Sequence, residues 1–421
     1  MRLARKGSLR GLVLALGLSV CPIVAFAQAP SDQAVLQNYA DLAQAGYEDS
    51  LAMAKALDRA VDALIAEPSE ATLEAAREAW KAARIPYQQT EAFRFGNPIV
   101  DEWEGKVNAW PLDEGLIDYV SASYGTESDS NELYTANVIA NPKLTIDGEE
   151  LDATNITPEL LAERLQEAAG VESNVATGYH AIEFLLWGQD LNGTGPGAGN
   201  RPFTDYSSAA HADRRAAYLK AATTLLVSDL EEMAGNWTAE GAARAALEEQ
   251  GISTILTGMG SLGFGELAGE RMKLGLLLHD PEEEHDCFSD NTHVSHLNDA
   301  IGIQNVYTGK YTRVDGPVVQ GPSLSEVIAS KDAALDTEIK DLLADTVSKM
   351  NVIADRAEGG EAYDQQIAEG NTEGDAVVQA AIDGLIAQTR GIERAVAVLE
   401  LGDAVTIENS DSLSNPDAVF E

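Results

Sequence analysis

The chain has 421 residues and a formal net charge of −41, from 69 acidic and 28 basic side chains. A surface this acidic repels nucleic acid and anionic membranes and attracts cations, which argues against nucleic acid as a partner. It does not by itself establish cation binding, because the same carboxylates can serve solubility or adaptation to salt. The length is sufficient for two or three domains.

Residues 1–27 are predicted to be a secretory signal peptide. Four basic side chains precede a short apolar segment, 11–20, and Ala25-Phe26-Ala27 supplies a small-x-small cleavage site. The competing interpretation is a lipobox around Cys21, but Val20 stands where a small residue is required. No later stretch approaches the ~20 apolar residues that span a bilayer. We therefore expect an exported, soluble protein of the periplasm, and lipoprotein anchoring is the less favoured alternative.

Most of the remaining chain is predicted to be helical. Its segments are rich in Ala, Leu, Glu, Gln and Lys and place apolar residues at intervals of three and four, as amphipathic helices require. Ser69 and Thr157 stand where two helices should begin. The best β candidate is a hairpin at 143–152. The expected helices are 34–66, 69–84, 158–169, 211–234, 239–249, 324–357 and 374–401, and the main irregular segments are 121–141, 188–205 and 280–291.

A weak internal repeat suggests two related helical bundles. The motifs His180-Ala-Ile-Glu183 and His296-Leu-Asn-Asp299 each open an apolar segment that ends in a glycine-rich loop, and each follows two or three helices. We therefore expect an all-α fold of two pseudo-repeated helical-bundle domains packed together. Residues 28–238 would form the first bundle and residues 239–421 the second.

Segment 178–188 carries the first candidate metal site. His180 and Glu183 stand at positions i and i+3 in an apolar stretch, so on a helix they share a face with their Cβ atoms about 5–6 Å apart. Burying either polar group alone would cost a few kcal/mol of folding free energy. A metal ion bound by both groups would compensate this cost. A His–Glu hydrogen bond in a core is the alternative. Glu91, in the aromatic segment 90–95, is the candidate third ligand of an oxygen-rich set suited to ferric iron.

Segment 279–296 carries a second cluster and holds four of the six histidines. If the chain is helical from Asp290 onward, Asp290 and His293 share a face and Asp286 joins them one turn earlier. Mixed imidazole and carboxylate ligands suit iron, zinc or manganese, whereas a calcium site would not use histidine. A solvated acidic loop is the alternative interpretation. The expected second site consists of His285, Asp286, Asp290 and His293, completed by Glu266, Glu270 or His296.

Glu266 and Glu270 stand one helical turn apart in a glycine-rich segment, 263–272. Glycines allow another helix to approach closely, so these carboxylates are expected to face a neighbouring element. Completion of the histidine site and pairing with Arg271 stay open as alternatives. Cys287, the only cysteine beyond residue 27, is interpreted as a small buried residue. A thiolate ligand there would instead shift the second site towards zinc or copper.

At these residues the chain resembles the imelysin family of exported bacterial proteins, in its iron-regulated branch. The resemblance implies an all-helical fold of two bundle-like domains, a periplasmic or surface location and a role in iron acquisition. The matching elements are the Gly-x-His-x-x-Glu motif at 178–183 and the segments 90–95, 110–119, 200–206 and 285–293.

We predict an iron-binding protein with two metal sites that captures or hands on iron in the periplasm, together with a membrane iron transporter or receptor. Zinc and copper are alternative ions. The rival functions are a metal-dependent peptidase or hydrolase and a cell-surface interaction module. A peptidase is disfavoured because the chain has no His-Glu-x-x-His helix, and Phe184 after Glu183 excludes the mirrored His-x-x-Glu-His motif. A catalytic zinc site also needs a general base, and none is evident.

Overall fold

The computed structural model describes Met1, residues 29–146 and residues 148–420. The predicted signal peptide therefore lies, apart from Met1, outside the described residues. Within the described chain helices dominate and the strands form two short hairpins, so the all-α prediction is confirmed. None of the described helices combines the length and apolar character needed to cross a membrane.

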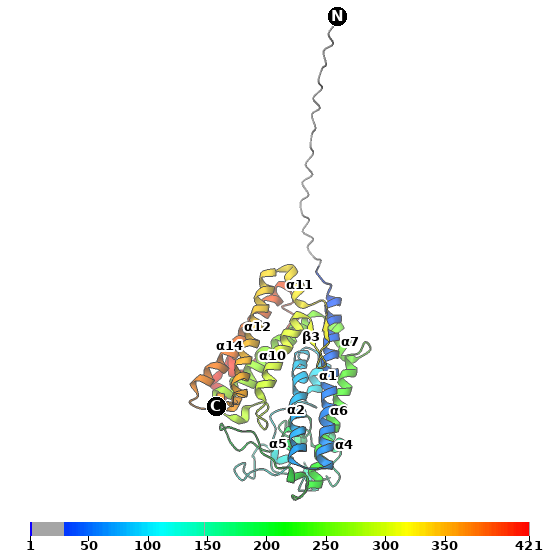
Figure 1. The fold of residues 1–421 in the computed structure, drawn as a ribbon, viewed down its shortest axis with the longest axis vertical. Coiled ribbons are helices and arrows are strands. Elements are labelled where there is room, and N and C mark those ends of the chain that lie inside the picture. The colour runs from blue at the N-terminus through cyan, green and yellow to red at the C-terminus, as the bar shows by residue number, and fades with distance from the viewer. Residues whose placement is uncertain (2–28, 147, 421) are drawn as a thin grey trace.

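Three long helices form one side of the molecule, where α1, α2 and α6 run side by side (Figure 1). Ser31 and Ser69 cap the first two of them, since each hydroxyl accepts a hydrogen bond from a backbone N–H of the first helical turn. The helices up to residue 261 are α1 (Asp32–Ala66), α2 (Glu70–Thr90), α3 (Pro98–Glu104), α4 (Pro158–Leu160), α5 (Gly178–Trp187), α6 (Ala212–Asn236), α7 (Ala242–Gln250) and α8 (Ile252–Ser261).

A second group of helices forms the other side, where α12 packs against α14 (Figure 1). Helix α10 contacts both α2 and α12 and so joins the two groups. After a π-helical segment, η6 (Leu262–Lys273), the helices are α9 (Leu274–Leu278), α10 (Thr292–Thr308), α11 (Leu324–Lys331), α12 (Ala333–Glu358), α13 (Tyr363–Ile367), α14 (Thr372–Leu399) and α15 (Asp411–Ser414).

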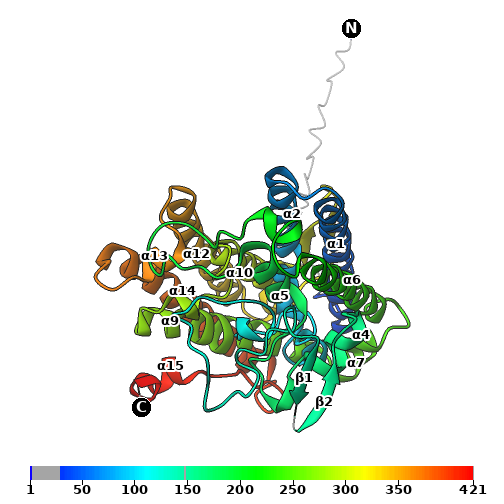
Figure 2. The same cartoon turned by 90° about the horizontal axis from the view of Figure 1, so that it is seen from below.

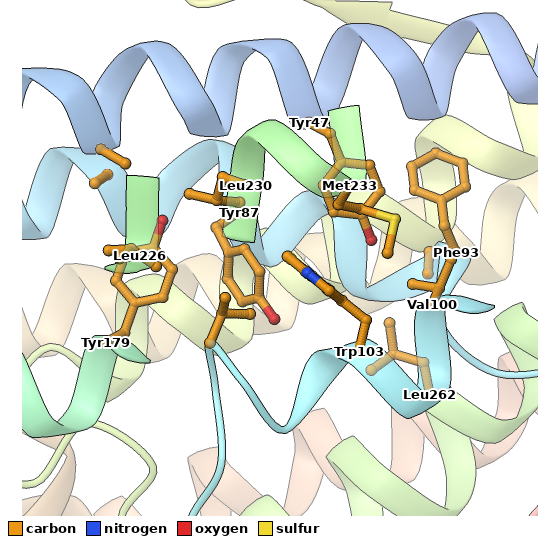
Figure 3. Close-up of a cluster of buried hydrophobic side chains, with 14 of the residues drawn as sticks. Tyr47, Tyr87, Phe93, Val100, Trp103, Tyr179, Leu226, Leu230, Met233 and Leu262 are labelled. Carbon is orange, nitrogen blue, oxygen red and sulfur yellow. The ribbon is translucent and has the colours of Figure 1, made fainter. Parts of the chain in front are cut away.

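Aromatic side chains fill the core between α1, α2, α3 and α5. Figure 3 shows Tyr47, Tyr87, Trp103 and Tyr179 gathered there with aliphatic side chains of α6. The rings of Tyr47 and Trp103 meet edge to face with centroids 5.8 Å apart, and the Trp103 indole N–H donates to the carbonyl of Asp229, 3.1 Å away. This rigid core supports the short helix α5, whose ten residues are all buried.

The hairpin predicted at 143–152 is present, with β1 (Lys143–Ile146) antiparallel to β2 (Glu149–Asp152) at one edge of the molecule (Figure 2). A second hairpin, β3 (Lys310–Thr312) with β4 (Val318–Gln320), was not predicted, because three-residue strands carry too little alternation to detect.

Three predicted helices differ most from the structure. The helix expected at 324–357 is broken at Asp332, whose side chain accepts from the first backbone N–H groups of α12. The helix expected at 158–169 ends early, since Glu167 and Ala169 both have positive φ. Helix α2 continues past residue 84 and through Pro86 to Thr90. The division at residue 238 and the pseudo-repeat stay predictions.

Candidate metal centre

His180 and Glu183 lie on α5, as the Gly-x-His-x-x-Glu motif predicted. The helix begins at Gly178, whose φ of 77° and close approach to the backbone of Val107 leave no room for a Cβ atom. The N–H of Tyr179 then donates to the carbonyl of Val107, 2.7 Å away. The glycine therefore fixes where the helix starts and where the imidazole of His180 lies.

Three buried side chains from distant parts of the chain converge on one point. His180 of α5 meets His285 and Asp286 of the segment before α10, and one potential ligand atom from each lies within 4.8 Å of the others. The two imidazole centroids are 4.7 Å apart. All three residues are at most 1% exposed. Two imidazoles and a carboxylate at this spacing are a donor set for a transition metal ion.

Glu183 orients the imidazole of His180. The distance from His180 Nδ1 to Glu183 Oε2 is 3.2 Å, and Glu183 Oε1 accepts from the backbone N–H and the hydroxyl of Ser289, at 3.0 and 2.6 Å. When Glu183 is ionised, Nδ1–H donates to it and the lone pair lies on Nε2. Nε2 of His180 is buried and has no hydrogen-bond partner in the structure, so it is free to bind an ion.

Arg84 of α2 holds Asp286 in place. Its Nη2 donates to Asp286 Oδ1 at 2.8 Å, while Asn291 and the hydroxyl of Ser295 donate to Oδ2. The Arg84 guanidinium also lies 3.4 Å from His285 Nδ1. When Glu183 is ionised, the centre holds two carboxylates against one guanidinium, and a bound cation would balance the extra negative charge.

Burial and charge prepare the two imidazoles as ligands. Burial, assisted by Arg84, lowers the pKa of His180 to about 3, and burial with the charge of Arg271 lowers the pKa of His285 well below its usual range. Both rings are therefore neutral near pH 7, the state that binds metal. Burial and the charge of Asp286 raise the pKa of Glu183, so a cation in the centre would favour its ionised form.

Two cavities reach the centre. His180 and His285 line a cavity of about 410 Å³ beside Trp110 and Tyr124. His285 also lines a second cavity of about 420 Å³. The carboxylates that border this second cavity are Glu104, Glu167, Glu172, Glu266 and Glu270. Arg94 and Arg271 also line this second cavity, but its five carboxylates outnumber them, so the surroundings of His285 favour cations.

The structure does not group the residues as the two-site prediction requires. His180, expected in one site, meets His285 and Asp286, expected in the other. Glu91 is not among these three groups, because Arg271 Nη2 donates to its carboxylate at 2.8 Å. Glu91, which was expected to be the third ligand, instead forms an ion pair with Arg271 in the structure.

The other members of the predicted second site lie outside this centre. Asp290 and His293 do not share a helical face, since α10 begins only at Thr292 and Asp290 has a left-handed φ of 54°. Glu266 pairs with Arg271 at 2.7 Å, which was one of the two alternatives for it. Of the remaining candidates, Glu270 is exposed, and His296 is fully buried with its ring against Tyr363.

Three residues that hold the candidate ligands in place were not predicted from the sequence. Arg84, Gln88 and Ser289 come within hydrogen-bond distance of Asp286, His285 and Glu183 in turn. Arg84 and Gln88 stand one helical turn apart and are both buried in α2, and this spacing of two polar residues is the pattern that could have identified them. Cys287 is half-buried and not disulfide-bonded. Burial and the charge of Glu282 raise the pKa of its thiol well above the usual range.

An all-helical fold around a buried centre of two histidines and an aspartate defines a helical protein with a candidate transition-metal site. The comparison with known families agrees with the sequence motifs. The imelysin (peptidase M75) family model matches residues 43–392, and the chain belongs to that family.

Two relatives illustrate the similarity. Iron-regulated protein A of Synechococcus elongatus is 33% identical over 106 residues, which cover 25% of this chain and 28% of the relative. A solved chain from Parabacteroides distasonis, described as a candidate iron-regulated protein A precursor, superposes with a TM-score of 0.62 at 19% identity. The superposition covers 88% of this chain and 96% of the solved one, and at this identity it establishes the fold alone.

Proposed function

We propose that this protein binds iron at the centre formed by His180, His285 and Asp286, and that it captures or hands on iron in the periplasm. The observation that carries the proposal is the convergence of the three ligands within 4.8 Å, with Nε2 of His180 unpartnered. Two neutral imidazoles and one carboxylate suit iron, and zinc or copper are the competing ions.

The comparisons support the iron-related and exported parts of the proposal. The curated relative is named as iron-regulated, and the solved relative is described as a precursor. The donor or acceptor of the iron would be a membrane iron transporter or receptor. The protein's own acidic surface and the acidic cavity beside His285 favour delivery of a cation to the centre.

The contacts of one residue, Glu183, support a carrier over a metallopeptidase. In a peptidase Glu183 would be the nearest candidate for a general base. Here one oxygen faces His180 and the other accepts from Ser289, which supports a role in orienting a ligand. A cell-surface interaction module would need neither the buried histidines nor their orientation.

Metal analysis of the purified protein tests the proposal. We expect one iron per chain in the wild type, and loss of that iron in both His180→Ala and His285→Ala. His211→Asn is the matched control, since His211 is exposed and Asn tolerates its φ of 60°. Full retention of iron in both centre variants would overturn the site. Peptide cleavage that requires metal and disappears in His180→Ala would replace the carrier function with hydrolysis.

A further inference from the structure

The cavity that His180 and His285 line is much larger than a metal ion. It measures about 410 Å³, whereas a single water molecule or ion needs only about 10–15 Å³ of such volume. Small-molecule sites in proteins usually measure roughly 300–1,000 Å³. The cavity therefore has room for an organic molecule next to an ion that the two imidazoles hold.

The protein groups of the candidate metal centre do not complete the coordination of an iron ion. His180, His285 and Asp286 form a set of two histidines and one carboxylate, and such a set leaves coordination positions open in non-haem iron sites. Both imidazoles line the cavity, and Nε2 of His180 has no hydrogen-bond partner in the structure. A molecule in the cavity can therefore reach an ion bound to these rings and supply further ligand atoms.

The charges around this cavity favour a cationic complex. None of the described residues that line it is Lys or Arg, whereas the second cavity at His285 is lined by Arg94 and Arg271. The carboxylates that line the first cavity are Asp113, Glu114, Glu282 and Glu283. An iron ion bound to an uncharged chelator keeps its positive charge, which these carboxylates attract. Citrate and other polycarboxylates make the iron complex anionic, and the same carboxylates repel it.

Aromatic side chains form part of the cavity wall. Trp110 meets the ring of His285 edge to face, with the centroids 5.8 Å apart. The rings of Tyr124 and Tyr134 are stacked with their centroids 4.2 Å apart. All three residues line the cavity and are half-buried, so each keeps an accessible part. Because aromatic rings stack on one another and attract cations over their faces, this wall favours a flat, aromatic ligand.

We propose that iron reaches this centre as a cationic complex with a small, uncharged, aromatic chelator. The chelator occupies the cavity against Trp110 while His180 and His285 hold the ion. This inference names the cargo of the same centre, and it rests on the proposed iron function. Trp110 is the residue expected to contact the chelator most closely, since it lines the cavity and also touches His285.

Gel filtration of the metal-free protein, mixed anaerobically with equimolar Fe²⁺ and 2,2′-bipyridine, tests the proposal. Bipyridine is uncharged, planar and aromatic, and it strips accessible iron from proteins as the red tris-bipyridine complex. We expect one iron and one bipyridine to elute with each chain of the wild type. With Fe²⁺ and citrate in the same experiment, we expect no citrate to elute with the protein. Iron binding without any chelator is measured in parallel.

Three variants test which residues hold the chelator. Trp110→Leu keeps an apolar side chain and removes the aromatic ring, so bipyridine retention should fall about 10-fold and more than iron binding does. Glu282→Gln removes one carboxylate of the wall and should weaken retention of the cationic complex at low salt. Glu127→Gln is the matched control, because Glu127 is exposed and does not line the cavity. It should retain the complex as the wild type does.

The outcomes separate this inference from the proposed function. If the wild type binds iron alone but loses it to bipyridine as the red complex, the chelate is wrong and the iron site stands. Retention of citrate equal to that of bipyridine would overturn the selection by charge. Unchanged bipyridine retention in Trp110→Leu would overturn the position of the chelator. Absence of iron binding both with and without a chelator would overturn the proposed function and this inference together.

Discussion

Two neighbouring groups of buried carboxylates differ in what balances their charge. Arg271 contacts three carboxylates, with Nη2 2.8 Å from Glu91 and 2.7 Å from Glu266 and with Nη1 3.3 Å from Asp299. In the candidate metal centre Arg84 pairs with the carboxylate of Asp286. The first group is therefore held together by protein atoms, whereas the second leaves ligand atoms available.

A third cluster resembles the Arg271 group. Arg215 binds Asp118 through two nitrogens, at 2.6 and 3.0 Å, and Arg201 bridges Asp118 and Asp205. Two guanidinium groups thus balance two carboxylates under the loop that follows α5. In the Arg271 and Arg215 clusters, guanidinium groups satisfy the buried carboxylates through charge-assisted hydrogen bonds.

The largest effect is expected from breaking the Arg271 group. Arg271→Met would leave Glu91 and Asp299 buried without their cation, at a cost of ~3–5 kcal/mol in the free energy of unfolding. Urea unfolding of the metal-free protein measures this loss. Arg394→Met is the control, because the pair of Arg394 with Glu338 is exposed and its removal should change stability little. Equal stability of the two variants would show that Arg271 does not hold its group together.

A pH experiment tests the buried, neutral state of His296, and iron retention tests its placement outside the candidate metal centre. His296 is fully buried, neither ring nitrogen has a hydrogen-bond partner in the structure, and burial with the charge of Arg271 lowers its pKa to about 3. The unfolded chain binds a proton below about pH 6.5 that the folded chain does not bind until about pH 3. Stability therefore falls as the pH drops through this window, by at most ~1.4 kcal/mol per pH unit.

His296→Phe should remove that contribution and keep the ring packing against Tyr363. Between pH 6.5 and 5 we expect the wild type to lose ~2 kcal/mol more than the variant in urea unfolding. Carboxylates with raised pKa values act in the opposite direction, but they are common to both proteins. The variant should also keep its iron. Parallel pH profiles would show that the pKa of His296 is not lowered, and loss of iron would place His296 among the metal ligands.

Periodicity predicted the long helices because each buries one apolar face along many turns. α1 and α14 end within two residues of their expected bounds. It could not place breaks that depend on single residues, such as the cap at Asp332, or the left-handed backbone of Glu167 and Ala169. These features arise from local hydrogen bonds and tertiary packing, which leave little trace in a repeat of 3.6 residues.

The site was predictable where its members share a helix and unpredictable where they do not. His180 and Glu183 follow from spacing alone. The segment before α10 has no regular period, so spacing gave the wrong partner for His293. Pairs such as Arg271 with Glu91, 180 residues apart in the chain, are set by how the helices pack. A single sequence read by itself does not distinguish such an ion pair from a ligand.

The final prediction compares the same substitution, Glu to Gln, in the candidate metal centre and in the Arg271 group. Glu183→Gln removes a carboxylate that orients a ligand, so iron affinity should fall about 10–100-fold. Its stability in the metal-free state should change by less than ~1 kcal/mol, because Glu183 has no arginine partner and the amide can still contact His180 and Ser289.

Glu91→Gln should show the reverse. It weakens a buried ion pair with Arg271, which should cost ~1–3 kcal/mol in urea unfolding, and it leaves iron affinity unchanged. Both variants keep the shape of the side chain, so the contrast reports charge and not packing. Equal losses of iron affinity in the two variants would make Glu91 a member of the metal centre after all, and equal losses of stability would make Glu183 a structural residue.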